Sequence, residues 1–395
     1  MCKDLFEKCV DFVERPRSVS DGQVALAADL FSAVSPPANA GPWVKSEDAP
    51  YLQFSTNDYL GLASDPEVQA RGAEAARQYG VSSPMGSRAM TGTTALHLEL
   101  ESQIAAFKRC EEALTFTTGS MAMMGMMAAL AGPGDTLFMD QFAHASLVCG
   151  ARISGATIVF FRHNDLDHLE RLLSQRNPDS AAAIVVDGVY SMQGHLAPLP
   201  ALVELKSRHG VRLIVDDAHG TGVFGPQGRG TAAHFGVEAG VDVHAGTFSK
   251  ALATMGGFVA GDRAVIEYLR FNAPTMLFTK AAPLAIVAAT RESLSKLEKA
   301  DAQRERLHKN AKRLQEGLMA NGFDIGGTQS PITPIQFCGN EALEVAHELR
   351  RAHRIWVSPV VYPAVEMGKS IIRIIPTARH TPDDVDFLID SLMAV

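Results

Sequence analysis

The stretch Leu213-Ile214-Val215-Asp216-Asp217-Ala218-His219-Gly220 joins a short apolar run to a cluster of acidic, basic and small residues. A run of this length, rich in β-branched residues and followed by polar and glycine residues, predicts a buried strand of a parallel sheet. In such sheets ligands bind beyond the carboxyl ends of the strands, where the acids and the histidine of this stretch fall. The stretch therefore predicts an α/β fold with a site at one edge of its sheet.

Similar runs recur along the chain. The other strand candidates are short and apolar and lie at 113–116, 136–139, 157–161, 183–186 and 241–243. Amphipathic segments typical of helices alternate with them, at 96–107, 166–173 and 199–209. This alternation predicts a mostly parallel central sheet with helices on both faces.

We expect three parts. Residues 1–50 form an N-terminal arm, a helix followed by the Pro/Gly-rich connection 35–42, and residues 51–283 form the large domain. Residues 284–395 form a smaller α+β domain. Its expected elements are an almost continuous helical stretch at 285–321, strands at 332–337 and 371–375, and helices at 342–352 and 382–393.

The bulk composition narrows the classes of function. The net charge of −8 over 395 residues argues against a nucleic-acid partner or a basic membrane-binding patch. The five cysteines are scattered and contain no C-x-x-C pair, which favours reduced thiols over a disulfide framework or a metal site. The longest uncharged apolar run, Met121–Ala131, is too short to cross a bilayer, and the first residues contain no signal-peptide core. We expect a soluble, cytoplasmic protein without a bound metal.

Four residues, which follow one another along the chain in the order Gly, His, Asp, Lys, are the candidates for binding and catalysis. Gly119-Ser120 opens an expected helix, His144 follows a strand, Asp216 ends another, and Lys250 follows the apolar Val243–Phe248. Together they are the parts needed to hold pyridoxal 5′-phosphate (PLP): a lysine that binds its aldehyde, an acid for its pyridine nitrogen, an aromatic ring over its face and a helix start for its phosphate. A lysine or histidine alone would more often be structural, so the combination decides the interpretation.

The supporting residues fit this cofactor. Asp216 is the better partner for the pyridine nitrogen because it directly follows a strand, although the choice between Asp216 and Asp217 stays open. His219 could reach the phenolic oxygen, and Thr247 and Ser249 supply hydroxyls near the lysine. Methionines beside the Gly119 turn are typical of core filler, but they leave open an adaptable wall for an acyl chain.

Arg373 interrupts the apolar run Ile371–Ile375. An arginine between isoleucines is rarely placed for stability, so we expect a bidentate contact with a substrate carboxylate. A structural salt bridge is the alternative.

From about Phe54 to Thr381 the chain resembles the α-oxoamine synthases, a branch of the fold-type I PLP enzymes with the aspartate aminotransferase-like fold. The motifs that carry the resemblance are Asn57-Asp58-Tyr59-Leu60-Gly61-Leu62, Gly86-Ser87-Arg88, Ala143-His144-Ala145-Ser146, Asp187-Gly188-Val189-Tyr190-Ser191-Met192, Asp216-Asp217-Ala218-His219-Gly220 and Gly246-Thr247-Phe248-Ser249-Lys250.

The resemblance implies a role for each matching position. Lys250 would hold the cofactor and move the α-proton of an amino acid, Asp216 would pair with the pyridine nitrogen, and His144 would stack on the ring. Ser191 and His219 would contact the ring oxygen. The implied phosphate contacts are the Ser120 and Met121 amides, the Thr247 hydroxyl and, from a second subunit, Thr279. Asn57 and Arg373 would hold the substrate carboxylate.

The implied reaction is the decarboxylative condensation of an amino acid with an acyl thioester, carried by coenzyme A or an acyl carrier protein, in a homodimer with its active site at the subunit interface. The chain departs from the family pattern at Ser120 and Met123, in 278–283 and in 360–365, all of which bear on the substrates. Two alternatives stay open: another PLP reaction on the same fold, such as an aminotransferase or aldol-type lyase, and a non-catalytic subunit of a synthase heterodimer, against which Lys250 argues.

Overall fold

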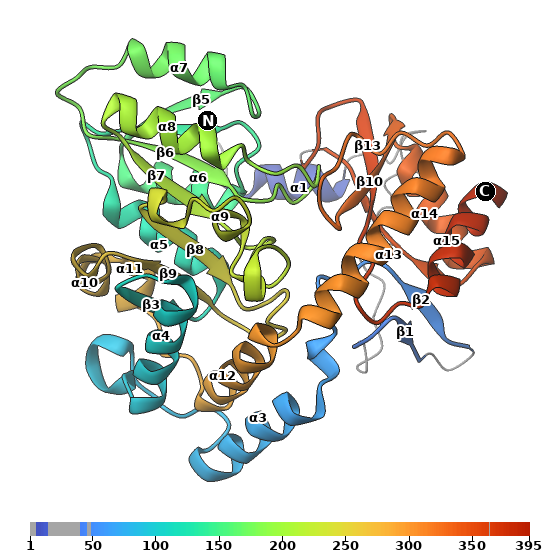
Figure 1. Cartoon of the computed structure of the whole chain (residues 1–395), viewed down its shortest axis with the longest axis horizontal. Helices are drawn as coiled ribbons and strands as arrows, with labels where there is room; N and C mark the ends of the chain where they lie inside the picture. The colour runs from blue at the N-terminus through green and yellow to red at the C-terminus, as the bar shows by residue number, and fades with distance from the viewer. Residues whose placement is uncertain (1–4, 15–39, 46–48, 363) are drawn as a thin grey trace.

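A seven-stranded sheet lies at the centre of the larger part of the molecule (Figure 1). The computed structural model describes residues 5–14, 40–45, 49–362 and 364–395. The strand order is β3-β9-β8-β7-β6-β4-β5, and every neighbouring pair is parallel except those made by β9. The strands are β3 (Glu112–Phe116), β4 (Thr136–Asp140), β5 (Thr157–Phe161), β6 (Ala182–Asp187), β7 (Arg212–Asp216), β8 (Val243–Thr247) and β9 (Gly257–Gly261). The mostly parallel α/β sheet predicted from the sequence is confirmed.

Helices cover both faces of this sheet because successive strand residues point to opposite sides. In β6, Val185 packs in one core with helices α5 and α6, whereas its neighbour Ile184 packs in another with α7 and α8. The helices of this part are α3 (Pro66–Tyr79), α4 (Ala95–Lys108), α5 (Gly119–Leu130), α6 (Ala145–Ser154), α7 (Leu166–Ser174), α8 (Leu199–His209), α9 (Thr231–His234), α10 (Arg263–Asn272) and α11 (Pro274–Leu277).

Two details of the sheet differ from the sequence prediction. The strand expected at 241–243 begins only at Val243, because Val241 still follows a short 3₁₀ turn at Glu238–Gly240. Strand β9 was not predicted at all. It is bounded by glycines and inserts antiparallel between β3 and β8, and this pairing with distant strands leaves no mark in its local pattern.

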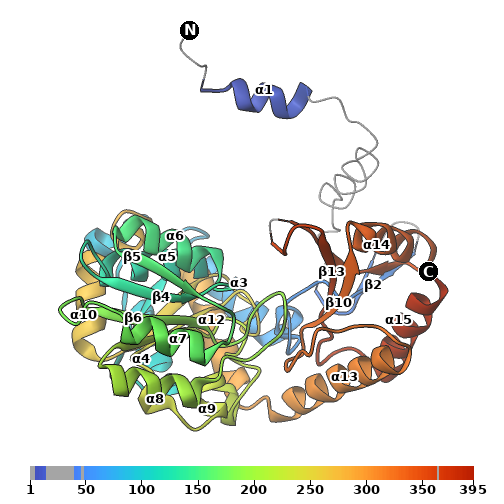
Figure 2. The ribbon, with the colours of Figure 1, turned by 90° about the horizontal axis from the view of Figure 1, so that it is seen from above.

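The C-terminal part contains a smaller antiparallel sheet of order β10-β13-β12. Figure 2 shows this sheet with its helices apart from the large sheet, with α13 running beneath. The elements are α12 (Leu284–Glu298), α13 (Asp301–Ala320), β10 (Thr333–Cys338), α14 (Glu341–Ala352), β11 (Ile355–Trp356), β12 (Ser358–Val360), β13 (Lys369–Ile374) and α15 (Pro382–Ala394). The helical stretch expected at 285–321 is therefore two helices, which separate at Lys299–Ala300.

The segment before the large sheet is tied to the C-terminal part. Strand β2 (Tyr51–Gln53) pairs with β1 (Trp43–Val44) and with β11, and Leu52 and Phe54 pack in the C-terminal core. Helix α1 (Glu7–Glu14) lies apart from the rest of the chain in Figure 2. Most of the Pro/Gly-rich connection expected at 35–42 falls outside the described residues, and the division into three parts stays a prediction.

No helix in the described ranges is both long and apolar enough to cross a membrane.

Candidate active site

A cavity of about 290 Å³ opens at the carboxyl ends of strands β6, β7 and β8. Asp187 of β6 lies beside Asp216 of β7, and Asp216 lies beside Ala245 of β8, which continues to Thr247. The side chains that follow these strand ends, and those at the starts of helices α5 and α6, form its wall. The lining residues used below are Thr118, Gly119, Ser120, Met123, His144, Asp187, Asp216, His219, Thr247, Lys250 and Met255.

Lys250 projects into this cavity just beyond β8. Burial lowers the pKa of its amine to about 8, with the charge of Arg373 acting in the same direction, while Asp216 and Asp187 oppose the shift. An ordinary lysine amine has a pKa near 10.5 and is almost fully charged at neutral pH. Lys250 is therefore free base in an appreciable fraction near neutral pH, as an amine that attacks an aldehyde or accepts a proton must be.

Asp216 and Asp187 place two buried carboxyl groups on the cavity floor. Burial raises the pKa of Asp216 to about 6, against the favourable charge of Lys250. The pKa of Asp187 is also raised well above its ordinary value, first by burial and then by the charge of Asp216. A cationic N–H group beside Asp216 would relieve this loss of solvation, so the floor suits a protonated ring nitrogen.

Asp217 points away from the cavity. Its carboxylate lies 3.2 Å from the Lys108 amine and accepts a hydrogen bond of 2.7 Å from the Thr231 hydroxyl. Of the two adjacent acids that the sequence could not separate, the structure brings only Asp216 to the site.

Two histidines line the cavity. His144 caps helix α6, and its own amide donates to Asp187 Oδ1 at 3.0 Å. His219 is 5% exposed, and its Nδ1 lies 2.7 Å from the Tyr59 hydroxyl. Burial, followed by the charge of Lys250, lowers the pKa of both rings, so both are neutral at physiological pH.

The amino end of helix α5 forms another wall. Thr118, Gly119 and Ser120 line the cavity with Thr247, where unpaired backbone N–H groups favour an anion. A Cβ atom on Gly119 would lie 2.6 Å from Thr247 Oγ1, so only glycine allows this approach. Met121 does not line the cavity, and its amide donates to Thr118 Oγ1 at 3.1 Å. The Met121 amide, which was expected to contact the phosphate, is thus already hydrogen-bonded to the residue that caps the helix.

Arg373 reaches toward the site from β13 of the C-terminal sheet. Its Nη2 donates to Asn57 Oδ1 at 2.8 Å, and its Nη1 donates to the carbonyl of Ser191 at 3.2 Å. Its buried Nε has no partner among the described residues. Arg373 thus joins the two other expected site residues, Asn57 and Ser191. Ser191 bonds to Arg373 through its backbone carbonyl and not through its hydroxyl.

Thr279 does not line this cavity. It lies beside a small separate cavity with Thr117 and Lys280. Asp187 is the main site residue that the sequence analysis did not single out, although the rule that selected Asp216, an acid at the carboxyl end of an apolar run, applies to it equally.

The residues present fit PLP. The cavity contains an amine of lowered pKa, a buried pair of acids, neutral aromatic rings and a helix start lined with hydroxyls. Gly119 leaves space at that helix start because it has no Cβ atom. These groups match the aldehyde, ring nitrogen, ring face and phosphate of that cofactor.

Comparison with known proteins identifies the family of the chain. The family model for aminotransferase class I and II matches residues 49–392. The chain is 37% identical over 362 residues to the cysteate-C-fatty acyltransferase of Capnocytophaga ochracea, covering 90% of this chain and 86% of that one. It is 39% identical over 350 residues to the 8-amino-7-oxononanoate synthase of Thermoanaerobacter pseudethanolicus, covering 88% of each. Among solved structures, Sphingomonas wittichii serine palmitoyltransferase superposes with a TM-score of 0.93 at 32% identity, covering 99% of this chain and 98% of that chain.

Proposed function

Because the chain belongs to the aminotransferase class I and II family and, within it, to the α-oxoamine synthases, we propose that the residues around Lys250 are the active site of its reaction. The protein is a PLP-dependent C-acyltransferase that condenses an amino acid with an acyl thioester and releases CO₂ and free thiol. The observation that supports the location is the convergence of Lys250, Asp216, His144 and His219 on one cavity.

In the proposed mechanism, Arg373 and Asn57 bind the carboxylate of the amino acid and so orient its α-C–H bond toward Lys250. Lys250 takes the α-proton as a free base. It returns a proton to the α-carbon after the new carbon–carbon bond has formed, the thiolate has left and the carboxylate has departed as CO₂. When bound, PLP supplies an electron sink for the electron pair left at the α-carbon. With PLP bound, Asp216 would hold a proton at the ring nitrogen, His144 would stack on the ring, and His219 and Ser191 would contact the ring oxygen.

We propose a small amino acid and a fatty acyl thioester as the substrates. The cavity has a volume of only about 290 Å³, and the flexible apolar side chains of Met123 and Met255 line it. The named activities of two relatives, cysteate-C-fatty acyltransferase and serine palmitoyltransferase, point to the same class.

We propose a cytoplasmic homodimer in which Thr279 completes the phosphate site of the partner. Thr279 lies outside the cavity of its own chain, and the neighbouring Phe278 is 88% exposed. Covering this apolar side chain at a subunit interface would remove it from water and so stabilise the dimer. The cysteines of the described residues are all unpaired, which suits a reducing compartment.

The test is free-thiol release by the PLP-loaded protein with a panel of small amino acids against short, medium and long acyl-coenzyme A and an acyl carrier protein. We expect release that requires one amino acid and a long acyl chain. Lys250→Ala should bind PLP without a covalent link, shown by the absence of a borohydride-fixed cofactor peptide, and should release no thiol. Turnover by that variant at the wild-type rate would contradict the assignment of Lys250.

A further inference from the structure

The buried hydroxyl of Tyr59 makes a contact with the site that none of the roles above uses. Tyr59 lies in the turn after β2 and is 1% exposed. Its Oη lies 2.7 Å from Nδ1 of His219, a residue 160 positions away in the chain. The two rings meet edge to face, with their centroids 6.1 Å apart.

The direction of this hydrogen bond follows from the number of protons. A phenol has one proton, and within the described part of the chain His219 Nδ1 is the only hydrogen-bond partner of the Tyr59 hydroxyl. If Nδ1 carried a hydrogen and donated it, the phenolic O–H would be buried without an acceptor, at a cost of about 1–3 kcal/mol. Burial also raises the pKa of Tyr59, so the phenol keeps its proton. The arrangement that satisfies both groups has Tyr59 donating and Nδ1 accepting.

A neutral imidazole that accepts at Nδ1 carries its hydrogen on Nε2. Burial lowers the pKa of His219 well below 6.5, and the nearby charges of Lys250 and Arg373 act in the same direction, so the ring is neutral. Its Nε2 has no hydrogen-bond partner among the described residues, and the ring lines the cavity. The available ring nitrogen is therefore a donor.

We propose that Tyr59 is a positioning residue that fixes His219 as its Nε2–H tautomer, so that the ring presents a hydrogen-bond donor, not an acceptor, to an oxygen bound in the cavity. The identity of that oxygen, the phenolic oxygen of PLP, rests on the proposed function. A donor at this position stabilises the oxygen as an anion through a charge-assisted bond, whereas an acceptor would repel it.

The second histidine of the cavity provides an internal reference. Nδ1 of His144 accepts from the backbone N–H of Ser146 at 3.3 Å and lies 2.6 Å from the Ser146 hydroxyl. A backbone amide can only donate, so His144 is held as the same tautomer without help from Tyr59.

The tautomers can be read in the cofactor-free protein by long-range ¹H–¹⁵N spectra of ¹⁵N-histidine-labelled samples, with the two rings assigned from His219→Gln and His144→Gln. We expect both to be Nε2–H in the wild type. In Tyr59→Phe, the Nε2–H to Nδ1–H ratio of His219 should fall about tenfold, the factor that corresponds to one hydrogen bond. His144 should not change.

Tyr190→Phe is the matched control, because it removes another fully buried hydroxyl that bonds to neither cavity histidine. It should leave both tautomers as they are. An Nδ1–H tautomer of His219 in the wild type, or an unchanged ratio in Tyr59→Phe, overturns the proposal.

Measurements on the PLP-loaded enzyme distinguish a failure of this proposal from a failure of the proposed function. With PLP bound, Tyr59→Phe should change the balance between the absorption bands of the cofactor. It should also lower kcat about tenfold, with the KM of the amino acid unchanged. If the wild type binds no PLP or releases no thiol, the proposed function fails, but the tautomer of His219 is still decided by the cofactor-free spectra.

Discussion

At the scale of single residues, the charges around Lys250 set the chemistry of the site. Arg373 lowers the pKa of the amine, Asp216 and Asp187 raise it, and burial decides the outcome. The two carboxyl groups are themselves held back from ionising by burial. The cofactor-free cavity therefore contains groups that change protonation near neutral pH, which is common at catalytic sites.

The lowered pKa of Lys250 predicts an unusual pH dependence of its reactivity. Only the free base of an amine is acylated, so the acylation rate of Lys250 in the cofactor-free protein should rise through pH 8 and level off above about pH 9. Competitive labelling with acetic anhydride, read by mass spectrometry of the Lys250 peptide, measures this, with the exposed Lys309 on α13 as the reference for reagent concentration. A midpoint near 10.5 would contradict the assigned environment.

The lowered pKa of Lys250 also makes the free energy of unfolding depend on pH. The folded-state pKa of Lys250, about 8, lies below the ordinary value of 10.5. Between these two pH values the unfolded chain binds more protons at this group than the folded protein does. The contribution of Lys250 to the free energy of unfolding therefore becomes more favourable as pH rises through this window, and it is unfavourable below it.

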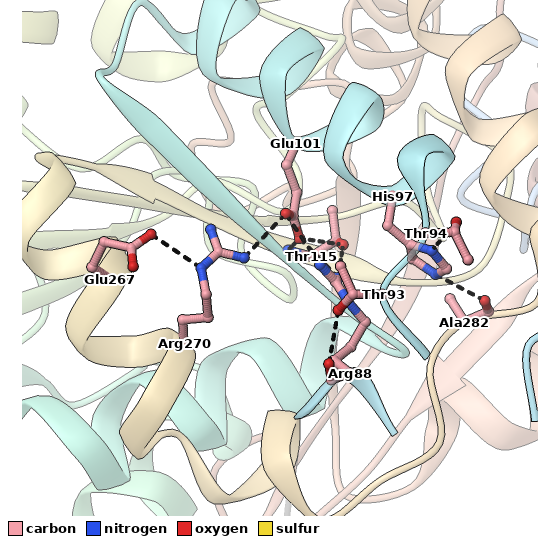
Figure 3. A network of polar contacts seen from close by, with 9 residues as sticks. All are labelled: Arg88, Thr93, Thr94, His97, Glu101, Thr115, Glu267, Arg270 and Ala282. Carbon is pink, nitrogen blue, oxygen red and sulfur yellow. Dashed lines mark hydrogen bonds and ion pairs between the residues drawn. The ribbon is translucent and has the colours of Figure 1, made fainter. Parts of the chain in front are cut away.

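At the scale of elements, a buried ion pair joins the segment before α4 to α4 itself, and both of its residues bond to Thr115 of strand β3 (Figure 3). Arg88 and Glu101 are 4% and 5% exposed, and their closest atoms are 2.8 Å apart. Glu101 also accepts from the backbone N–H of Thr115 at 2.9 Å and faces Arg270 at 3.4 Å. Residue Ser87, next to Arg88, forms a β-bridge with Lys280, so the ion pair also supports the segment that carries Thr279.

Glu101→Gln should therefore destabilise the protein strongly. It removes the negative charge that neutralises the buried Arg88, and loss of one partner of a buried pair costs about 3–5 kcal/mol. Unfolding in urea, followed by circular dichroism, measures the loss.

Glu99→Gln is the control, because the same change on the same helix removes only a half-exposed pair with Arg291, worth about 0–1 kcal/mol. Equal effects of the two substitutions would show that the buried pair contributes no more than the surface pair.

At the scale of the whole molecule, the proposed sharing of sites between subunits predicts complementation. Lys250→Ala removes the amine of one site, and Thr279→Glu would place a negative charge against the phosphate of the partner's site. Each variant alone should be inactive. A mixed dimer would contain one site with both changes and one intact site.

Random mixing of the two inactive variants should restore thiol release to about a quarter of the wild-type rate, because half of the dimers are mixed and half of their sites are intact. The measurement is thiol release after the two chains are co-expressed with different affinity tags. No recovery in purified mixed dimers would mean that Thr279 acts in the site of its own chain, and full activity of Thr279→Glu alone would mean that Thr279 contacts no phosphate.

The sequence by itself determined the features that depend on local pattern. Short apolar runs, each followed by a polar or small residue, gave the parallel strands and placed Asp216 and His144 at their carboxyl ends, because period and composition follow from which faces of a strand are buried. The glycine start of α5 could be predicted for the same local reason. The motifs around Lys250 and His219 were sufficient for the family.

Tertiary structure alone decided the contacts between residues far apart in the chain. It brought Arg373 to Asn57, separated Asp216 from Asp217, inserted β9 between two distant strands and set Tyr59 against His219. It also placed Thr279 outside the cavity of its own chain. These arrangements arise from the packing of whole elements, which no local period in the sequence encodes.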